Sequence, residues 1–394
     1  MKPIEISKDI YWLGVIDWNI RDFHGYSTYE GSTYNAFLIM DEKIALIDTV
    51  KKGFEDELIE GITHLVDPKK IDYVISNHTE MDHSGGLPRI MHRIGEDKPL
   101  YCSKIGHKNL SRHFPQQWNY QPVETGGELS LGKRNLTFVE TRMLHWPDSM
   151  FTYLKEDKIL FSSDGFGQHY AGIERFDDEI GEAIMPHARK YFANILLLYA
   201  PLVLKLVDKV NEMGLAIDMI CPDHGIIWRK DPAKIISSYV EWSLQKPKRK
   251  ALVIYDTIWH STQVMAEAIV ASLGEEGVNA RPMHLRTYHR SDIMTEVLDA
   301  GAVIVGSPTL NNGLFPTVTD FLAYMKGLKP NNKVAAAFGS YGWSGEAVKL
   351  INREFEQMKF DVIDPGIRIS YVPDNQGLKA CYELGKKIAK ALPG

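Results

Sequence analysis

Several side chains that can bind a metal lie in one short segment, His78-Thr79-Glu80-Met81-Asp82-His83. Imidazole nitrogens and carboxylate oxygens are both metal ligands, and four of the six residues can bind a metal. The segment follows an apolar, strand-like run at residues 73–76, and Ser84-Gly85-Gly86 then opens a helix. Alternation along an extended segment predicts His78, Glu80 and Asp82 on one side, and the turn into the helix could bring His83 to them. A solvated loop could be as polar but would not usually follow a buried strand directly, so the segment predicts a metal site.

Three more residues with metal-binding side chains lie downstream, each at the end of a strand-like run. They are His145 in Leu144-His145-Trp146-Pro147, Asp164 in Phe161-Ser162-Ser163-Asp164, and His224 in Cys221-Pro222-Asp223-His224-Gly225. A lone histidine beside a turn is usually a surface or core residue. His145 and His224 are therefore candidates only in combination with the dense segment.

The segment from His78 to His83 resembles the metal-binding motif of the metallo-β-lactamase fold, with one departure. Hydrolases of that fold have a third histidine where this chain has Glu80, and the glutamate form is similar to the flavodiiron proteins, also called A-type flavoproteins. The resemblance covers essentially the whole chain, including the segment from Arg142 to Met150, and is closest to the rubredoxin:oxygen oxidoreductase branch. It implies an α/β chain in which a metallo-β-lactamase-like αββα sandwich precedes a flavodoxin-like, doubly wound parallel sheet.

The resemblance also implies a ligand set for two irons. His78, Glu80 and His145 would hold one iron, Asp82, His83 and His224 the other, and Asp164 would bridge them. Neutral imidazoles with three carboxylates suit two ferrous ions that keep positions open for a substrate. A first site of imidazoles alone would favour zinc hydrolysis, whereas a hard carboxylate stabilises ferric iron. The ligand at the position of His83 is not always engaged within the family, so its binding to iron stays open.

A segment over the di-iron pocket is implied as well. His24 and Tyr26, in Asp22-Phe23-His24-Gly25-Tyr26, match a family segment that could donate protons to reduced oxygen, and the alternative interpretation is an ordinary loop. Ligand imidazoles normally pass their other proton to an acceptor, so further supporting residues are expected. Relatives often have tyrosine where this chain has Phe192. One pocket hydroxyl is therefore absent, and the balance between dioxygen and nitric oxide stays open.

A second constellation lies in the loop Asp256-Thr257-Ile258-Trp259-His260-Ser261-Thr262. It offers hydroxyl groups and successive backbone amides at a helix amino terminus, which together form an anion site. No lysine or GK[ST] motif is present, so a nucleoside triphosphate is not expected, and neutral donors around one phosphate ester suit FMN. The loop resembles the flavodoxin phosphate loop, with His260 where many flavodoxins have glycine. Many helices begin with serine or threonine merely as caps, so this loop alone is weak evidence.

Two further loops follow the next strands and strengthen the flavin hypothesis. Their glycines allow a planar ligand to approach the backbone closely, and Trp343 could stack on an isoalloxazine ring. Backbone groups of these loops would hydrogen-bond the ring and tune its potential. We expect FMN to bind against residues of all three loops: Thr257, Ile258, Trp259, His260, Ser261, Thr262, Ser307, Pro308, Thr309, Asn311, Asn312, Gly313, Ser340, Tyr341, Gly342, Trp343, Ser344 and Gly345.

The pattern of predicted strands and helices that must position these residues differs between the two halves of the chain. Up to about residue 245, strand-like and helical runs are mixed; strands are predicted at 11–17, 36–40, 45–49 and 73–76, and helices at 55–65 and 233–244. Beyond it, strands and helices alternate, which predicts a parallel sheet with its ligand at the carboxyl ends of the strands. The predicted strands there are 251–255, 302–306 and 334–338, and the helices 263–273, 318–326 and 346–358. The basic segment Gln245–Lys250 separates a predicted metal domain, residues 1–247, from a flavin domain, residues 248–394.

Composition narrows the functional classes. A length of 394 residues suits two domains, and a net charge of −6 argues against a general binder of nucleic acid or membrane surfaces. The three cysteines form no CxxC motif, so no zinc ribbon or cysteine-ligated cluster is expected. The apolar stretch at residues 191–207 contains Asn194, Pro201 and Lys205 and predicts a buried helix, not a membrane span. The amino terminus has no signal-peptide pattern, so a cytoplasmic location is the default.

The resemblance implies an enzyme that reduces dioxygen to water, nitric oxide to nitrous oxide, or both, in defence against oxidative or nitrosative stress. It also implies a separate electron donor, either rubredoxin or a reduced deazaflavin, and a head-to-tail homodimer or a dimer of dimers. Two alternatives remain. One is a zinc hydrolase fused to a flavodoxin module, against which Glu80 argues. The other is an electron carrier whose first domain is only structural, against which the seven candidate ligands argue.

Overall fold

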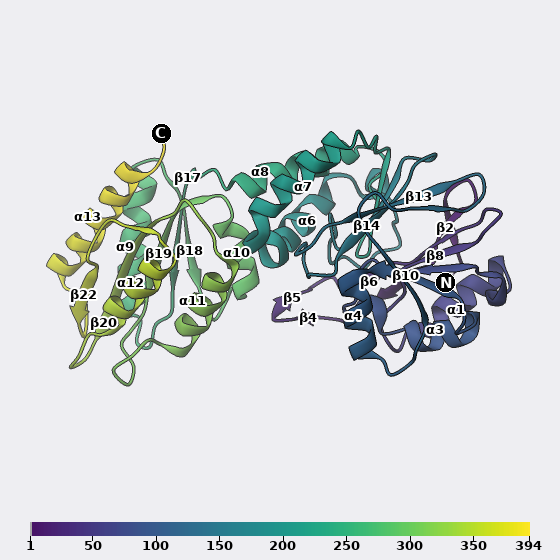
Figure 1. Cartoon of the computed structure of the whole chain (residues 1–394). Helices are drawn as coiled ribbons and strands as arrows, with labels where there is room; N and C mark the ends of the chain where they lie inside the picture. Colours follow the sequence, from purple (N-terminus) through teal and green to yellow (C-terminus); the bar gives the residue numbers. More distant parts are fainter. Residues whose placement is uncertain (1) are drawn as a thin grey trace. The chain divides into compact units, whose positions relative to one another are not determined.

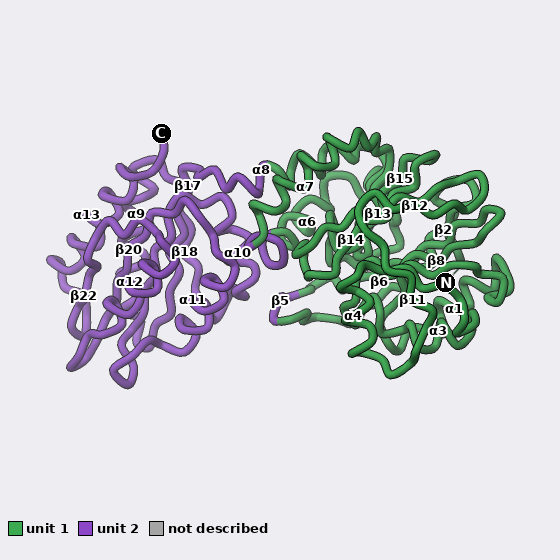
Figure 2. Tube along the Cα trace, in the orientation of Figure 1, with its two compact units in different colours: residues 1–24, 28–192, 199–240 green, residues 25–27, 193–198, 241–394 purple. Residues whose placement is uncertain are grey.

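The computed structural model describes residues 2–394, which form two compact units (Figure 2). Unit 1 runs to His24 and adds Thr28–Phe192 and Tyr199–Val240. Unit 2 consists of Gly25–Ser27, Ala193–Leu198 and Glu241–Gly394. The domain boundary between residues 247 and 248 stays a prediction.

Unit 1 contains two larger sheets (Figure 1). The seven-stranded sheet has the order β1-β2-β7-β8-β9-β10-β11, and the five-stranded sheet the order β12-β13-β14-β15-β16. The strands of the first sheet are β1 Ile4–Ser7, β2 Ile10–Trp12, β7 Phe37–Ile39, β8 Ala45–Ile47, β9 Tyr73–Ile75, β10 Pro99–Ser103 and β11 Asn119–Val123. Those of the second are β12 Glu128–Ser130, β13 Asn135–Glu140, β14 Met150–Leu154, β15 Ile159–Ser163 and β16 Met219–Pro222.

Alternation along the strands divides the apolar side chains of unit 1 between two cores. Ile39 and Ile47 of the first sheet share one core with Phe138 and Phe161 of the second, so the sheets pack face to face. The opposite face of the first sheet packs against α1 Glu55–Leu65, α3 Leu87–Ile94 and α4 Lys104–His113. Ring contacts from Phe151 through Phe166 to Tyr239 of α8 (Pro232–Leu244) link the second sheet to its covering helices. The predicted αββα sandwich is confirmed.

The strand predicted at residues 11–17 is wrong as a single element. The chain leaves the first sheet after β2 and enters β3 (Val15–Asp17), which pairs with β6 (Ser32–Tyr34) instead. Gly14 lies at the break, where a Cβ atom would come within 2.7 Å of the Tyr34 carbonyl oxygen. The close approach of two backbones therefore explains both the glycine and the interruption.

Unit 2 is built on a parallel sheet of order β18-β17-β19-β20-β21, with β22 also paired to β20. Its strands are β17 Lys248–Tyr255, β18 Asn279–His284, β19 Ala300–Gly306, β20 Val334–Tyr341, β21 Asp361–Val362 and β22 Ile367–Ser370. Its helices are α9 Ser261–Glu275, α10 Arg290–Val297, α11 Pro316–Leu328, α12 Ala347–Gln357 and α13 Asn375–Ala391. This is the flavodoxin-like order, in which the sheet changes winding direction between its first and third strands, here β17 and β19. The predicted second fold is confirmed.

One helical run, Asp177–Glu212, is long and apolar enough to cross a membrane by length and composition. It is not a continuous α-helix, because a π-helical turn at Phe192–Leu196 and a 3-10 turn at Leu197–Tyr199 interrupt it. Tyr191 and Phe192 are buried inside the protein. Pro201 and Lys205 of the same run are exposed, so the predicted buried helix is observed as an interrupted and only partly buried run.

Candidate metal and flavin sites

The ends of three strands bring the candidate metal ligands together in unit 1. The loop after β9 carries His78 and Glu80, and the short helix α2 (Met81–Ser84) carries Asp82 and His83. Asp164 directly follows β15, and His224 follows β16. His145 lies in the loop between β13 and β14. All are buried except His145, which is partly exposed.

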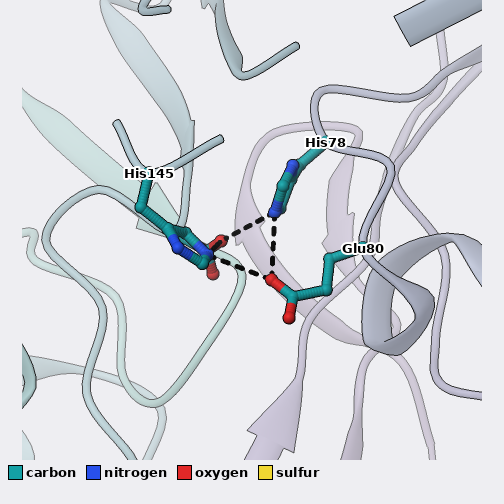
Figure 3. Close-up of side chains that lie close together, drawn as sticks. His78, Glu80 and His145 are labelled. Carbon is teal, nitrogen blue, oxygen red and sulfur yellow. Dashed lines mark hydrogen bonds and ion pairs between the residues drawn. The ribbon is translucent and has the colours of Figure 1, made fainter. Parts of the chain in front are cut away.

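His78, Glu80, His145 and Asp164 form the first group of converging atoms. Figure 3 shows the two imidazoles and the Glu80 carboxylate pointing toward one another. Glu80 Oε2 lies 3.2 Å from His78 Nε2 and 3.0 Å from His145 Nε2. Asp164 Oδ2 lies 3.4 Å from His78 Nε2 and 3.0 Å from His145 Nε2.

Asp82, His83 and His224 form the second group. Asp82 Oδ2 lies 3.3 Å from His83 Nε2 and 3.1 Å from His224 Nε2. Asp164 Oδ1 lies 3.2 Å from His83 Nε2 and 3.4 Å from His224 Nε2. The two oxygens of Asp164 therefore face different groups, which is the geometry of a carboxylate that bridges two cations.

The expectation that His78, Glu80 and Asp82 share one side is wrong. Glu80 is still extended, with φ −63° and ψ 148°, but the helix begins at Met81. The helical turn places Asp82 in the group with His83 and His224, because alternation holds only while the chain is extended. One short segment thus supplies both groups.

Several buried polar atoms of the two groups lack a hydrogen-bond partner within residues 2–394, as expected for atoms that bind metal ions. Among the described residues, both carboxylate oxygens of Asp82, both ring nitrogens of His83 and Oδ2 of Asp164 make no hydrogen bond. Buried groups in that condition are costly unless an ion or water satisfies them. Ligands about 2.1 Å from a metal are separated by about 3.0 Å in octahedral and about 3.4 Å in tetrahedral geometry, which the observed spacings match.

Neighbouring carboxylates raise the pKa values of the two histidines in the first group. Burial lowers the pKa of His78, but hydrogen bonds with Asp148 and Glu80 outweigh burial and raise that pKa to about 10. For His145, burial is likewise outweighed by Asp164 and Glu80, which raise the pKa to about 9. Because a metal binds the neutral imidazole, protons compete with a metal for these two side chains.

Sequence reasoning missed the residues that orient the first group. Asp148 is buried, lies 3.1 Å from His78 Nδ1 through Oδ2, and accepts a hydrogen bond from the Thr79 amide at 2.8 Å. Buried Asp48 accepts hydrogen bonds from the backbone and side-chain nitrogens of Asn77, both at 2.7 Å. Asp148 lies in the segment that carried the resemblance, but no spacing rule singled it out. Asp148 can thus fix the tautomer and orientation of the His78 imidazole, whereas Asp48 holds the neighbouring backbone at Asn77.

A hydroxyl group reaches the site from a residue adjacent to Phe192. The Tyr191 hydroxyl donates a hydrogen bond to Asp164 Oδ1 at 3.0 Å. Phe192 instead packs against Tyr239, with 5.1 Å between ring centroids. Position 192 thus offers no hydroxyl group, as predicted, but the buried Asp164 carboxylate still has a tyrosine partner in Tyr191.

The two residues predicted above the pocket have different surroundings. His24 Nε2 lies 2.8 Å from Glu80 Oε1, and 71% of the His24 side chain is exposed. Tyr26 is buried in β5 (Tyr26–Ser27). The His24 side chain is thus in contact with both solvent and Glu80 of the first group, whereas the role of Tyr26 stays a prediction.

The three predicted flavin loops lie at the carboxyl ends of β17, β19 and β20 in unit 2. His260 has φ 65°, the left-handed conformation that glycine adopts readily, which fits its replacement of a flavodoxin glycine. In the second loop, Asn311 and Asn312 also have positive φ, and Leu310 and Gly313 close a tight turn with two hydrogen bonds.

Hydroxyl groups connect these loops and leave one donor available. The Thr262 and Ser340 hydroxyls lie 2.9 Å apart, which joins the first loop to the third. Ser344 donates a hydrogen bond to Asn312 Oδ1 at 3.3 Å, which joins the third to the second. The buried Thr257 hydroxyl has no hydrogen-bond partner among the described residues, so it is free to bind a phosphate. Trp343 is 86% exposed and available for stacking.

Comparisons with known proteins match both domains of the chain. The ODP family beta lactamase model matches residues 33–225, and the Flavodoxin model matches residues 253–385. A nitric oxide reductase of Moorella thermoacetica is 47% identical, with 98% of each chain covered. The structure of rubredoxin oxygen:oxidoreductase from Desulfovibrio gigas has a TM-score of 0.97 and 43% identity, covering 99% of this chain and 98% of that one.

A flavodiiron protein of Giardia intestinalis gives a TM-score of 0.95 at 36% identity, covering 99% of this chain and 96% of that one. These likenesses span both units. The chain therefore belongs to the flavodiiron proteins, oxidoreductases that join a β-lactamase-type metal domain to an FMN-binding flavodoxin domain.

Proposed function

We propose that this chain reduces dioxygen to water, nitric oxide to nitrous oxide, or both, in oxidative and nitrosative stress defence. One iron is held by His78, Glu80 and His145, and the other by Asp82, His83 and His224, with Asp164 as the bridge. FMN is held by the three loops that follow β17, β19 and β20.

The placement of Asp164 carries this proposal. Its Oδ1 faces His83 and His224 while its Oδ2 faces His78 and His145, at 3.0–3.4 Å. A single cation would need only one of these groups, whereas two cations sharing a carboxylate explain both. His83 is included as a ligand because it is buried and converges with Asp82 and Asp164.

The donor set favours iron over zinc. Structural and catalytic zinc sites are mostly built from imidazoles and thiolates, and each of the three free cysteines is buried away from the two groups. Mixed imidazole and carboxylate ligands with open positions suit non-haem iron. Glu80 supplies the carboxylate that distinguishes the first group from a histidine-only zinc site. The zinc hydrolase alternative is therefore disfavoured.

When bound, the reduced iron pair and reduced FMN supply two electrons each, the four that dioxygen needs to become water. The chain's own residues hold this chemistry in place. Asp148 holds His78 through Nδ1, and Tyr191 holds Asp164 through Oδ1. His24 can deliver a proton from solvent beside Glu80 Oε1, where it already lies at hydrogen-bond distance.

The finer features of the function follow from the family resemblance. The electron donor is a separate reductant, rubredoxin or a reduced deazaflavin. The working form is a head-to-tail homodimer or a dimer of dimers, in the cytoplasm. Dimers with two-fold symmetry are the commonest oligomeric solution.

Anaerobic reduction of the purified protein, followed by mixing with dioxygen or nitric oxide, tests the proposal. We expect flavin absorbance to recover as the gas is consumed, with two irons bound per chain. Rapid consumption of one gas alone would assign the substrate. A purified protein with zinc, no iron and no gas consumption would instead support the hydrolase alternative, and a flavin-loaded protein without metal would support an electron carrier.

A further inference from the structure

A buried carboxylate lies at the base of the first flavin loop. Asp256 directly follows β17 and has no exposed surface. It accepts hydrogen bonds from the Thr257 amide at 2.6 Å and from the Thr317 hydroxyl at 2.5 Å. An anion at this place is unexpected, because the adjoining loop is the one that should receive a phosphate.

Arg286 is the permanently charged partner of this carboxylate among the described residues. Its Nε lies 3.0 Å from Asp256 Oδ1, and its Nη2 donates a hydrogen bond to the Thr257 carbonyl oxygen at 3.0 Å. Its guanidinium carbon lies 5.1 Å from the centroid of the Phe315 ring. One side chain thus contacts both the buried anion and the backbone of the flavin loop.

Electrostatics explains why this arrangement matters. Burial raises the pKa of Asp256, but hydrogen bonds from Thr317, the Thr257 amide and Arg286 outweigh it and lower that pKa. Asp256 is therefore an anion at neutral pH. Because Asp256 itself is buried, its charge would repel a second, doubly charged anion beside it unless a cation compensates.

We propose that Arg286 makes this loop selective for a phosphate ester by neutralising Asp256 and fixing the backbone at Thr257. Arg286 is thus a positioning residue for FMN and acts through the loop. The inference rests on the proposed binding of the FMN phosphate by residues 257–262. It predicts that Arg286 contributes to the binding of FMN but not to that of riboflavin, which has the same ring and no phosphate.

Flavin titrations of the flavin-depleted, full-length chain test this inference through fluorescence quenching. We expect Arg286→Met to weaken FMN binding by about 10- to 100-fold, the usual effect of losing a charged hydrogen bond, and to leave riboflavin binding unchanged. Asp256→Asn combined with Arg286→Met should recover most of the FMN affinity, because no uncompensated anion remains. Arg281→Met is the matched control, since Arg281 lies on neighbouring β18 and pairs with Glu296.

Three results would overturn the inference. FMN affinity could be unchanged in Arg286→Met, riboflavin affinity could fall in parallel, or the double variant could bind FMN no better than the single one. Parallel loss would indicate a purely structural role for Arg286. If the unaltered chain binds FMN and riboflavin equally, the phosphate site itself is misassigned, which separates failure of the proposed function from failure of this inference.

Discussion

At the scale of single residues, the site depends on where each oxygen and nitrogen points. The residue types around His78 indicated a metal site, and the family resemblance supplied the two ligand sets. The resemblance also implied that Asp164 bridges the two groups, but sequence could not show that Tyr191 and Asp148 hold these side chains. Such contacts join residues far apart in the chain, and no periodicity or spacing reports them.

Removal of the proposed bridge tests the metal assignment. We expect Asp164→Ala to lose stable binding of both irons, because each group loses a ligand, while FMN content is unchanged. Iron and flavin analysis of the purified variant measures this. Asp218→Ala, an exposed aspartate paired with Lys158, is the control. Two irons per chain with normal turnover in Asp164→Ala would contradict the assignment.

The acceptor behind His78 should matter almost as much as a ligand. Asp148→Asn keeps the shape of the side chain but weakens its hold on the imidazole proton at Nδ1. We expect iron affinity to fall by roughly 10- to 100-fold, as for other supporting residues of metal sites. Competition with a chelator measures this affinity. Asp157→Asn, near the surface and paired with Arg134, should leave it unchanged; equal affinities in both variants would refute the role of Asp148.

Among the elements, most candidate functional residues of both units lie at or just after the ends of strands. Regular segments were predictable: the helix at residues 55–65 is observed with those bounds, and the predicted core of β17, β19 and β20 is present. Short or polar strands such as β11, β12 and β18 were not predicted, because pairing with neighbours stabilises them more than their own composition does. The break at Gly14 was missed for the same reason, since it depends on contact with Tyr34.

The loop between β17 and α9 should bind the phosphate of FMN. We expect Ser261→Ala with Thr262→Ala to weaken FMN binding by about 1–3 kcal/mol per lost contact, with iron content unchanged. Thr262 also bonds Ser340, so this variant loosens the third loop as well. Thr319→Ala, an exposed threonine of α11, is the control. An unaltered FMN dissociation constant in the double variant would mean that the phosphate binds elsewhere.

At the scale of the whole molecule, the two cofactor sites belong to different units, and turnover requires electrons to pass between them. The family resemblance implies that the flavin of one subunit serves the iron pair of another in a head-to-tail homodimer. The alternatives are transfer within one chain or a hinged flavin domain. These explanations predict different activities for a dimer of two different inactive chains, so a complementation experiment distinguishes between them.

One inactive chain carries substitutions in the Thr257–Thr262 loop and lacks FMN; the other carries Asp164→Ala and lacks iron. If electrons cross between subunits, a mixed dimer contains one competent pair of sites, and co-refolded samples should recover part of the reductase activity. Oxygen or nitric oxide consumption measures that recovery, and differently tagged chains verify that mixed dimers are present. Each variant refolded alone is the control. Persistent inactivity with mixed dimers present would mean that the flavin and the irons exchange electrons within one chain.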